Sequence, residues 1–426
     1  MLKTLRESLS LLTTRRFGTF WFASFLSSIG TWTQQVAEPW LLLALGASPF
    51  LIGLDSFAMN APVLLLILAG GALADRCDRR LVIALFQSIQ MLCPIAIVVL
   101  LITGLIQPWM IISLAVIVGI TDALSMPSFQ SIVPSIVARD QIDRGLALNS
   151  TQFNLSRVLG PSIAGVLISS IGAMSCFVIS AVSYVPFIGV ALWILPRWVP
   201  KPRRAGTSLR RPAFTDIADL LRQRLVRGAL LNVLITSLFC APLITFIPLL
   251  VKDVFQGDAS RFSMAIAAFG IGGLLGAVGL LSVGSSVDRR RLCMVFSLCY
   301  GAVLVVIALT PWYWGMLLLV MVAGAAMTIC GTSANSLLQA TVNSQLLGQT
   351  VSLYMLAMRG GFALGALFTG VLVSCVGVQY ALLFNGVVAV ILQLVVMRLW
   401  FRDPLLIAKH PNIVTLSPSN IIHCES

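Results

Sequence analysis

The segment GVLISSIG at residues 165–172 recurs as GVLVSCVG at residues 370–377, with five of the eight positions identical. Two further matches share nearly the same spacing: Arg157 with Arg359, and Asp78-Arg79-Arg80 with Asp288-Arg289-Arg290. Because these displacements agree to within short insertions, the sequence predicts that the chain contains two copies of one structural unit.

The composition predicts that most of each copy lies in lipid. Of the 426 residues, 58% are hydrophobic and 10% are charged, whereas soluble domains carry about 25% charged residues. Apolar runs of about 20 residues, enough to cross about 30 Å of hydrocarbon, lie at residues 18–46, 50–74, 81–103, 108–130, 146–170, 173–195, 228–251, 260–283, 292–310, 312–338, 350–375 and 378–401. These runs predict an all-α membrane protein of twelve transmembrane helices. With six spans each, the two repeats enter the membrane in the same orientation and are therefore parallel.

A long, basic and proline-containing stretch separates the two repeats. It predicts four regions, namely an N-terminal six-helix half (1–195), a cytoplasmic basic linker (196–227), a C-terminal six-helix half (228–403) and a cytoplasmic tail (404–426).

The net charge of +13 is explained by membrane topology. If the N-terminus lies in the cytoplasm, every lysine and arginine except Arg157, Lys252, Arg261 and Arg359 falls in a cytoplasmic segment. This asymmetry follows the positive-inside rule and predicts that both termini are cytoplasmic. The basic residues therefore do not indicate a nucleic-acid partner.

The sequence excludes several kinds of catalytic site. Both histidines, His410 and His423, lie in the tail, so a histidine-based metal site or catalytic triad cannot form within the membrane. The nine cysteines are scattered without a CxxC pair and are interpreted as small packing residues. No G-x-x-x-x-G-K-[ST] motif occurs, so ATP is not the direct energy source. We expect neither enzymatic activity nor a cofactor.

The loop between the second and third predicted spans reads GGALADRCDRR at residues 70–80. It resembles the loop signature G-x-L-x-D-R-x-G-R-R of the major facilitator superfamily, with Asp78 in place of a glycine. In that family the loop is a conformational latch. The resemblance implies this role for the matching residues Gly71, Asp75, Arg76, Arg79 and Arg80.

The fifth predicted span contains RVLGPSIAG at residues 157–165, which resembles the antiporter signature R-x-x-G-P-x-x-G-G of exporting members at Gly160, Pro161 and Gly165. A wider block at residues 30–54, 122–137 and 147–161 is similar to the macrolide-efflux and siderophore (enterobactin) exporter branch of the superfamily. Both similarities imply export.

The resemblance implies a monomeric secondary transporter of the bacterial inner membrane. It would export a small amphipathic molecule, a siderophore or a drug-like compound, in exchange for protons. Its partners would be that substrate, protons and the lipid bilayer, together with an outer-membrane export system. A broad multidrug or macrolide pump is the first alternative, and an importer or a non-transporting receptor of the same fold are two others.

Five charged residues lie within the predicted spans: Glu38, Asp55, Asp122, Arg157 and Arg359. Each costs about 2.5–3.5 kcal/mol near the bilayer centre, which makes them functional candidates. Glu38 ends a polar stripe that includes Gln34 and Gln35, and its helical spacing places these residues on one face. We expect this face to line the substrate cavity and Glu38 to bind a proton.

Asp122 and Arg157 lie at matching depths on consecutive spans, which predicts an ion pair that is either structural or titrating. With Glu38, they are the candidates for proton coupling. Arg359 has no acid within the spans of its own half, because Met327 stands where the repeat would place the equivalent of Asp122.

We therefore expect Arg359 to bind an anionic group of the substrate, the alternatives being cytoplasmic water or an acid of the N-terminal half. Asn335 and Gln339 belong to a second polar stripe, on span 10. This stripe is the counterpart of the stripe on span 1 and is expected to line the same cavity.

Overall fold

The computed structural model describes residues 10–138, 141–195, 220–282, 287–342 and 347–401. Most of the predicted linker and the whole predicted tail lie outside these ranges. The N half consists of six long helices, α2 (Arg15–Ala44), α3 (Pro49–Arg76), α4 (Arg79–Thr103), α5 (Pro108–Ile136), α6 (Ile142–Ser170) and α7 (Met174–Trp193).

The C half repeats this plan with two interrupted spans. Its first span joins α9 (Arg224–Ile235), the π-helical turn η3 (Thr236–Cys240), α10 (Leu243–Leu249) and the π-helical turn η4 (Leu250–Val254). Next come α11 (Ala259–Ser282), α12 (Arg289–Leu309) and α13 (Tyr313–Thr341). The fifth span joins α14 (Leu347–Met355), the π-helical turn η5 (Leu356–Gly360) and α15 (Gly361–Val376), and α16 (Val378–Phe401) is the last. The predicted twelve-helix fold is confirmed.

Local sequence signals set the ends of these helices. Ser48 caps α3, with Pro49 at the first helical position, where its missing N–H is no loss. Gly104 ends α4 in the left-handed conformation at φ +70°, which glycine adopts without strain. Asp78 caps α4 and Asp288 caps α12 in the same way, each accepting a hydrogen bond from the backbone N–H two residues later. The predicted repeat thus reappears in local geometry.

Ten helical segments in the described ranges are long and apolar enough to cross a membrane. The two long helices that do not meet this criterion are α2, which carries Gln34, Gln35 and Glu38, and α6, which carries Arg157. Each packs against the other, and α6 also packs against α11 of the C half. Neighbouring helices therefore cover much of the polar surface of α2 and α6.

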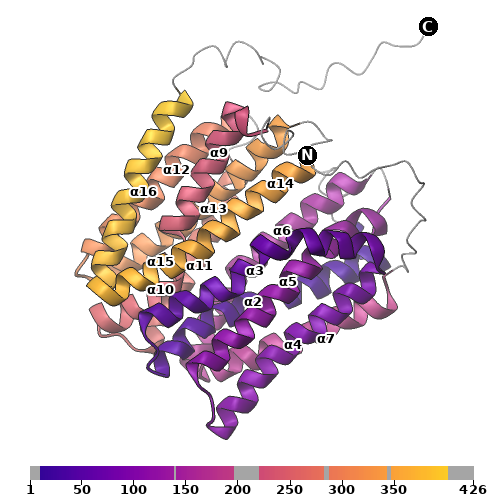
Figure 1. Cartoon of the computed structure of the whole chain (residues 1–426), viewed down its shortest axis with the longest axis horizontal. Coiled ribbons are helices and arrows are strands. Elements are labelled where there is room, and N and C mark those ends of the chain that lie inside the picture. Colours follow the sequence, from indigo (N-terminus) through magenta and orange to yellow (C-terminus); the bar gives the residue numbers. More distant parts are fainter. Residues whose placement is uncertain (1–9, 139–140, 196–219, 283–286, 343–346, 402–426) are drawn as a thin grey trace.

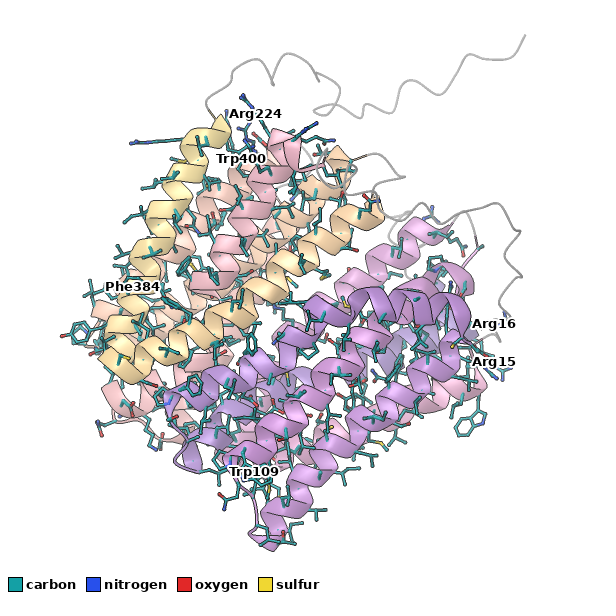
Figure 2. All side chains as sticks on the ribbon, in the orientation of Figure 1. Arg15, Arg16, Trp109, Arg224, Phe384 and Trp400 are labelled. Carbon is teal, nitrogen blue, oxygen red and sulfur yellow. The ribbon has the colours of Figure 1, made fainter. Side chains whose placement is uncertain are left out.

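The bundle has a basic end and an opposite end. The basic end is where α2, α4, α9 and α12 begin, at Arg15, Arg79, Arg224 and Arg289. The opposite end carries the connections at residues 45–48, 104–107, 171–173, 255–258 and 310–312. In Figure 1 the helices of the two halves diverge toward the upper right. Figure 2 correspondingly shows Arg224 of the C half well separated from Arg15 and Arg16 of the N half.

The two halves pack tightly near the opposite end, in a contact region that we call the seal. Trp40 of α2 and Phe262 of α11 stack with ring centroids 4.7 Å apart. Two pairs of backbones approach so closely that a Cβ atom on Gly53 would lie 2.4 Å from the carbonyl oxygen of Ala366, and one on Gly165 would lie 2.8 Å from that of Ser263. Small residues permit this close approach between helices in lipid.

Candidate functional site

The polar stripe of α2 faces the interior of the N half. Gln34 Nε2 donates to Glu38 Oε1 at 2.8 Å, and Ser180 Oγ of α7 donates to Gln34 Oε1 at 2.7 Å. Glu38 and Gln34 are 2% and 3% exposed, whereas Gln35 is half-buried. Gln34 and Glu38 are thus enclosed by the N half in this conformation, and the role of the stripe in lining a cavity stays a prediction. Gln34 is hydrogen-bonded by Ser180 of α7, and Glu38 is hydrogen-bonded by Gln34 of its own helix, as buried polar groups generally require.

A second buried carboxylate, Asp55 of α3, lies within electrostatic reach of Glu38. Asp55 is 2% exposed, and its Oδ1 has no hydrogen-bond partner among the described residues. The next residue, Ser56, is hydrogen-bonded to Thr245 of α10 at 3.3 Å, which connects this region to the seal. The sequence identified Asp55 as an intramembrane charge but gave no indication that it lies close to Glu38.

At the middle of the bundle, Arg359 of η5 forms an ion pair with Asp122 of α5 across the two halves. Two predictions are thereby corrected, because Asp122 does not pair with Arg157, and Arg359 does have an acidic partner. Asp122 and Arg157 lie at matching depths, but η5 of the other half also reaches Asp122. A π-helical turn such as η5 changes the direction of the side chains that follow it and often marks a functional site.

Arg157 of α6 also reaches into the other half. Its Nη2 lies 3.3 Å from the Sδ of Met327 on α13, and its guanidinium lies 5.6 Å from the centre of the Trp32 ring. Met327 occupies the same position in α13 as Asp122 does in α5, in helices of equal length. The two repeats thus make equivalent contacts between the halves, one with a carboxylate and the other with a thioether.

The polar residues of α13 lie toward the basic end. Gln339 Nε2 donates to Asn335 Oδ1 at 3.0 Å, and Gln339 is exposed. Tyr354 of α14 is buried and donates to the carbonyl oxygen of Gly331 at 3.2 Å. The role of Asn335 and Gln339 in lining the substrate cavity stays a prediction.

In the loop signature, the described contacts centre on Asp78 and the two arginines that follow. Arg80 Nε donates to Asp78 Oδ2 at 2.9 Å, Arg80 Nη1 donates to the carbonyl oxygen of Leu192 at 3.2 Å, and Arg79 Nε donates to that of Ala74 at 3.2 Å. The side chains of Asp75 and Arg76 lie outside the described part of the chain. The latch role stays a prediction.

The glycine that brings helices together near this loop is Gly70, not the motif residue Gly71. A Cβ atom on Gly70 would lie 2.6 Å from the carbonyl oxygen of Ala123 on α5, whereas one on Gly71 would meet nothing within 4 Å. Spacing alone could not tell the two apart, because adjacent helical residues face different neighbours.

The antiporter signature forms the contact surface of α6. A Cβ atom on Gly160 would lie 2.4 Å from the Cβ of Trp32, so the glycine lets α2 approach α6. Thr33 Oγ1 donates to the carbonyl oxygen of Gly160 at 3.1 Å. Pro161 is buried within the helix, and Gly165 contacts the seal. These residues position Arg157 and Trp32 next to each other.

Comparison with known proteins agrees with this architecture. The profile of the family described as transmembrane secretion effectors matches residues 7–410. The chain belongs to this family of major facilitator transporters. It is therefore a multi-pass membrane transporter and not an enzyme.

Its curated relatives include transporters of both predicted kinds. The staphyloferrin A transporter of Staphylococcus aureus is 24% identical over 381 residues, covering 88% of this chain and 94% of the relative. The multidrug efflux pump Tap of Mycolicibacterium fortuitum is 24% identical over 388 residues, covering 87% and 94%. The predicted similarity to siderophore and drug-efflux transporters is confirmed.

Solved structures share the fold at low sequence identity. The nucleoside transporter NupG superposes with a TM-score of 0.70 at 14% identity, covering 92% of this chain and all of that one. A bacterial homologue of the lysosomal transporter Spinster, in an inward-facing and unoccupied conformation, gives a TM-score of 0.65 at 16% identity, covering 91% and 95%. The resemblance to these structures is one of fold.

Proposed function

We propose that this transporter exports a small amphipathic molecule across the bacterial inner membrane in exchange for protons. The observation that carries the proposal is the burial of two neighbouring carboxylates, Glu38 and Asp55, beside the seal. An ionised carboxylate is strongly destabilised in such surroundings, whereas a protonated one is tolerated. Protonation of this pair would therefore favour the sealed conformation.

The transport cycle follows from this coupling. When the seal is open, protons from the outer side neutralise Glu38 and Asp55 and allow the halves to close there. When the basic end is open, the pair releases these protons to the cytoplasm, and the charged carboxylates then destabilise the seal. Bound substrate in the central cavity would accompany the return to the outward-open state, so that proton entry and substrate exit alternate.

The assignment of sides rests on the distribution of basic residues. If the basic end is cytoplasmic, as the positive-inside rule predicts, both termini are cytoplasmic and the structure is closed toward the outside. An exporter loads its substrate in this conformation. The Asp122–Arg359 pair joins the halves at the middle of the bundle, where it can open and close with the movement of the two halves.

Proton coupling supplies enough energy for export. One proton moving down a potential of about 150 mV releases roughly 3.5 kcal/mol, which supports a concentration ratio of roughly 300-fold for a neutral substrate. The names of the relatives favour a siderophore or a drug-like compound as the substrate. Like other transporters of this plan, the protein would work as a monomer, and a siderophore would need a separate route across the outer membrane.

Proton exchange can be measured with purified protein in proteoliposomes that have an acidic interior and contain a pH-sensitive dye. Staphyloferrin A and ethidium serve as the siderophore and the drug-like probe. Addition of a transported probe outside should alkalinise the interior as protons leave in exchange. Protein-free vesicles provide the control. Probe uptake without a change in internal pH would contradict antiport.

A broad multidrug pump is the second candidate, because the relative Tap is named as one and because methionine and aromatic side chains surround Arg157. Such surfaces adapt to varied ligands. Competition separates the two candidates. Many unrelated compounds should inhibit uptake by a multidrug pump, whereas a siderophore exporter should respond to one chemical class.

A further inference from the structure

The two equivalent contacts between the halves differ in one chemical respect. Arg359 reaches across to Asp122, whereas Arg157 reaches across to Met327, which holds the position of Asp122 in the other repeat. The first contact therefore contains an acid and a base. The second contains a base and a neutral sulfur.

Nothing among the described residues neutralises Arg157. Its ionisable neighbours there are the phenols of Tyr300 and Tyr354, and its direct contacts are Met327 and the Trp32 ring. The arginine is half-buried at the middle of the helix that contacts the C half. A cation in this position is costly unless it faces water or an anion, and a thioether is only a weak acceptor.

The surroundings of Arg157 suit an amphipathic ligand. Trp32 and Met327 come from opposite halves and flank the guanidinium, and the buried hydroxyl of Tyr300 lies 4.0 Å from the same sulfur. Aromatic and thioether groups pack readily against an apolar or aromatic body. The guanidinium offers a planar pair of donors that matches a carboxylate.

We propose that Arg157, with Trp32 and Met327, is the subsite for an anionic group of the transported molecule. The ligand's carboxylate takes, at Arg157, the place that Asp122 takes at Arg359. In doing so it displaces the weak contact with Met327 and forms an ion pair with Arg157 where the two halves meet. This inference rests on the proposed transport function and adds to it the substrate class, an amphipathic organic anion.

The symmetry gives the subsite a sharp test. In Met327→Asp, the protein itself supplies the missing acid, which should pair with Arg157 and exclude the ligand. Met327→Leu removes the sulfur without adding charge. Arg157→Gln removes the cation, and Arg157→Lys keeps the charge without the planar pair of donors.

Arg261 provides a matched control. Like Arg157 it lies over an aromatic ring, at 5.4 Å from that of Tyr313, but it belongs to the opposite end of the bundle. Arg261→Gln therefore removes one cation stacked on a ring without touching the proposed subsite.

Binding is measured by equilibrium dialysis of radiolabelled 2-naphthoate and its neutral analogue 2-naphthamide. Purified full-length protein in nanodiscs is used, with empty nanodiscs as background and thermal melting to verify folding. Wild type should prefer the anion. Loss of one charge-assisted contact should weaken naphthoate binding by about 10- to 100-fold in Arg157→Gln and Met327→Asp. Naphthamide binding should stay unchanged in both variants.

Arg157→Lys should be intermediate, and Met327→Leu and Arg261→Gln should retain the preference of the wild type. Equal affinities of the wild type for both probes would overturn the proposal. Unchanged naphthoate binding in Met327→Asp, or equal losses for both probes in Arg157→Gln, would overturn it too.

The result is independent of proton coupling. If naphthoate selectivity depends on Arg157 while substrate uptake leaves internal pH unchanged, the subsite stands and the antiport mechanism fails. If antiport is observed but both probes bind equally, the antiport mechanism stands and the proposed subsite fails.

Discussion

The N half and the C half share one plan of helices but differ in what they bury. The three acids in the middle or interior of the described helices, Glu38, Asp55 and Asp122, all belong to the N half. Both halves bury neutral amides, but among the described residues the C half buries amides without any acid. Asn232 Oδ1 accepts from Ser297 Oγ at 2.9 Å, and Gln393 Nε2 donates to Thr236 Oγ1 at 3.2 Å.

This difference assigns different properties to the two halves of the repeated fold. Neutral hydrogen bonds hold helices together at any pH, whereas buried carboxylates respond to protonation. The C half contributes Arg359 from a π-helical turn and the wall around Met327. The N half contains the buried acids, whose charge would change on protonation. Four predictions extend the comparison of the two halves, beginning with the largest expected effect.

Breaking the ion pair between the halves should have the strongest effect. Asp122→Asn or Arg359→Gln leaves one intramembrane charge without its partner, at an expected cost of about 2–4 kcal/mol for a pair that is partly exposed. Each single variant should lose most transport. The double variant should be expressed and transport better than either, because no lone charge remains. Membrane expression and transport are measured in the wild type, the two single variants and the double variant. These values give the coupling energy between Asp122 and Arg359, and strictly additive losses would contradict the pair.

Neutralising Glu38 or Asp55 should reduce the dependence of substrate accumulation on the pH gradient. Glu38→Gln and Asp55→Asn should lower proton-driven accumulation about 10- to 100-fold, since the proton gradient no longer adds energy, while substrate exchange at equal pH persists. Gln393→Leu, which removes a buried amide of the C half, should retain the pH response. Accumulation and exchange are compared in proteoliposomes between pH 6 and 8. A wild-type pH response in both acid variants would remove the proposed role.

Helix contact near the loop signature should depend on Gly70 more than on Gly71. Gly70→Val forces a side chain against the backbone of α5 and should destabilise the protein by about 1–3 kcal/mol. Gly71→Val should have a smaller effect, as should Gly279→Val in the C half, where a Cβ atom also meets nothing within 4 Å. Thermal unfolding of the three detergent-purified variants is the measurement. An equal loss of thermal stability in the three variants would show that the space around each glycine does not determine the effect of the substitution.

The smallest effect is expected at the two equivalent helix caps. Asp78→Ala and Asp288→Ala should each cost about 1 kcal/mol, since each removes one N-cap. Asp78→Ala should cost slightly more, because the ion pair of Asp78 with Arg80 is shorter, at 2.9 Å, and less exposed than that of Asp288 with Arg291, at 3.7 Å. The two melting temperatures are compared directly. A larger loss at Asp288 would mean that the loop signature in the N half has no additional structural role.

A separate variant tests the predicted latch. Asp75→Asn should alter the balance between the conformations, and therefore the turnover rate more than the apparent affinity for the substrate. Initial rates over a range of probe concentrations measure both. A change confined to affinity would argue against a latch.

The sequence by itself determined the twelve helices, the repeat and the family. Each depends on local properties, because an apolar run of sufficient length must cross the membrane as a helix whatever its neighbours are. The loop and antiporter signatures are likewise contiguous. Even the depth of Asp122, Arg157 and Arg359 could be obtained by counting residues from the ends of the helices.

Only the tertiary structure decided which of these charges meet. Asp122 and Arg359 are 237 residues apart in the chain, and their pairing depends on how the two halves cross at the middle of the bundle. Depth restricts a side chain to one level of the membrane, but the rotation of each helix and the neighbour it faces are set by packing. The same holds for Glu38: the spacing predicted a polar stripe on one helix face, but only the packing of α2 against α7 decided that Gln34 and Glu38 lie inside the N half.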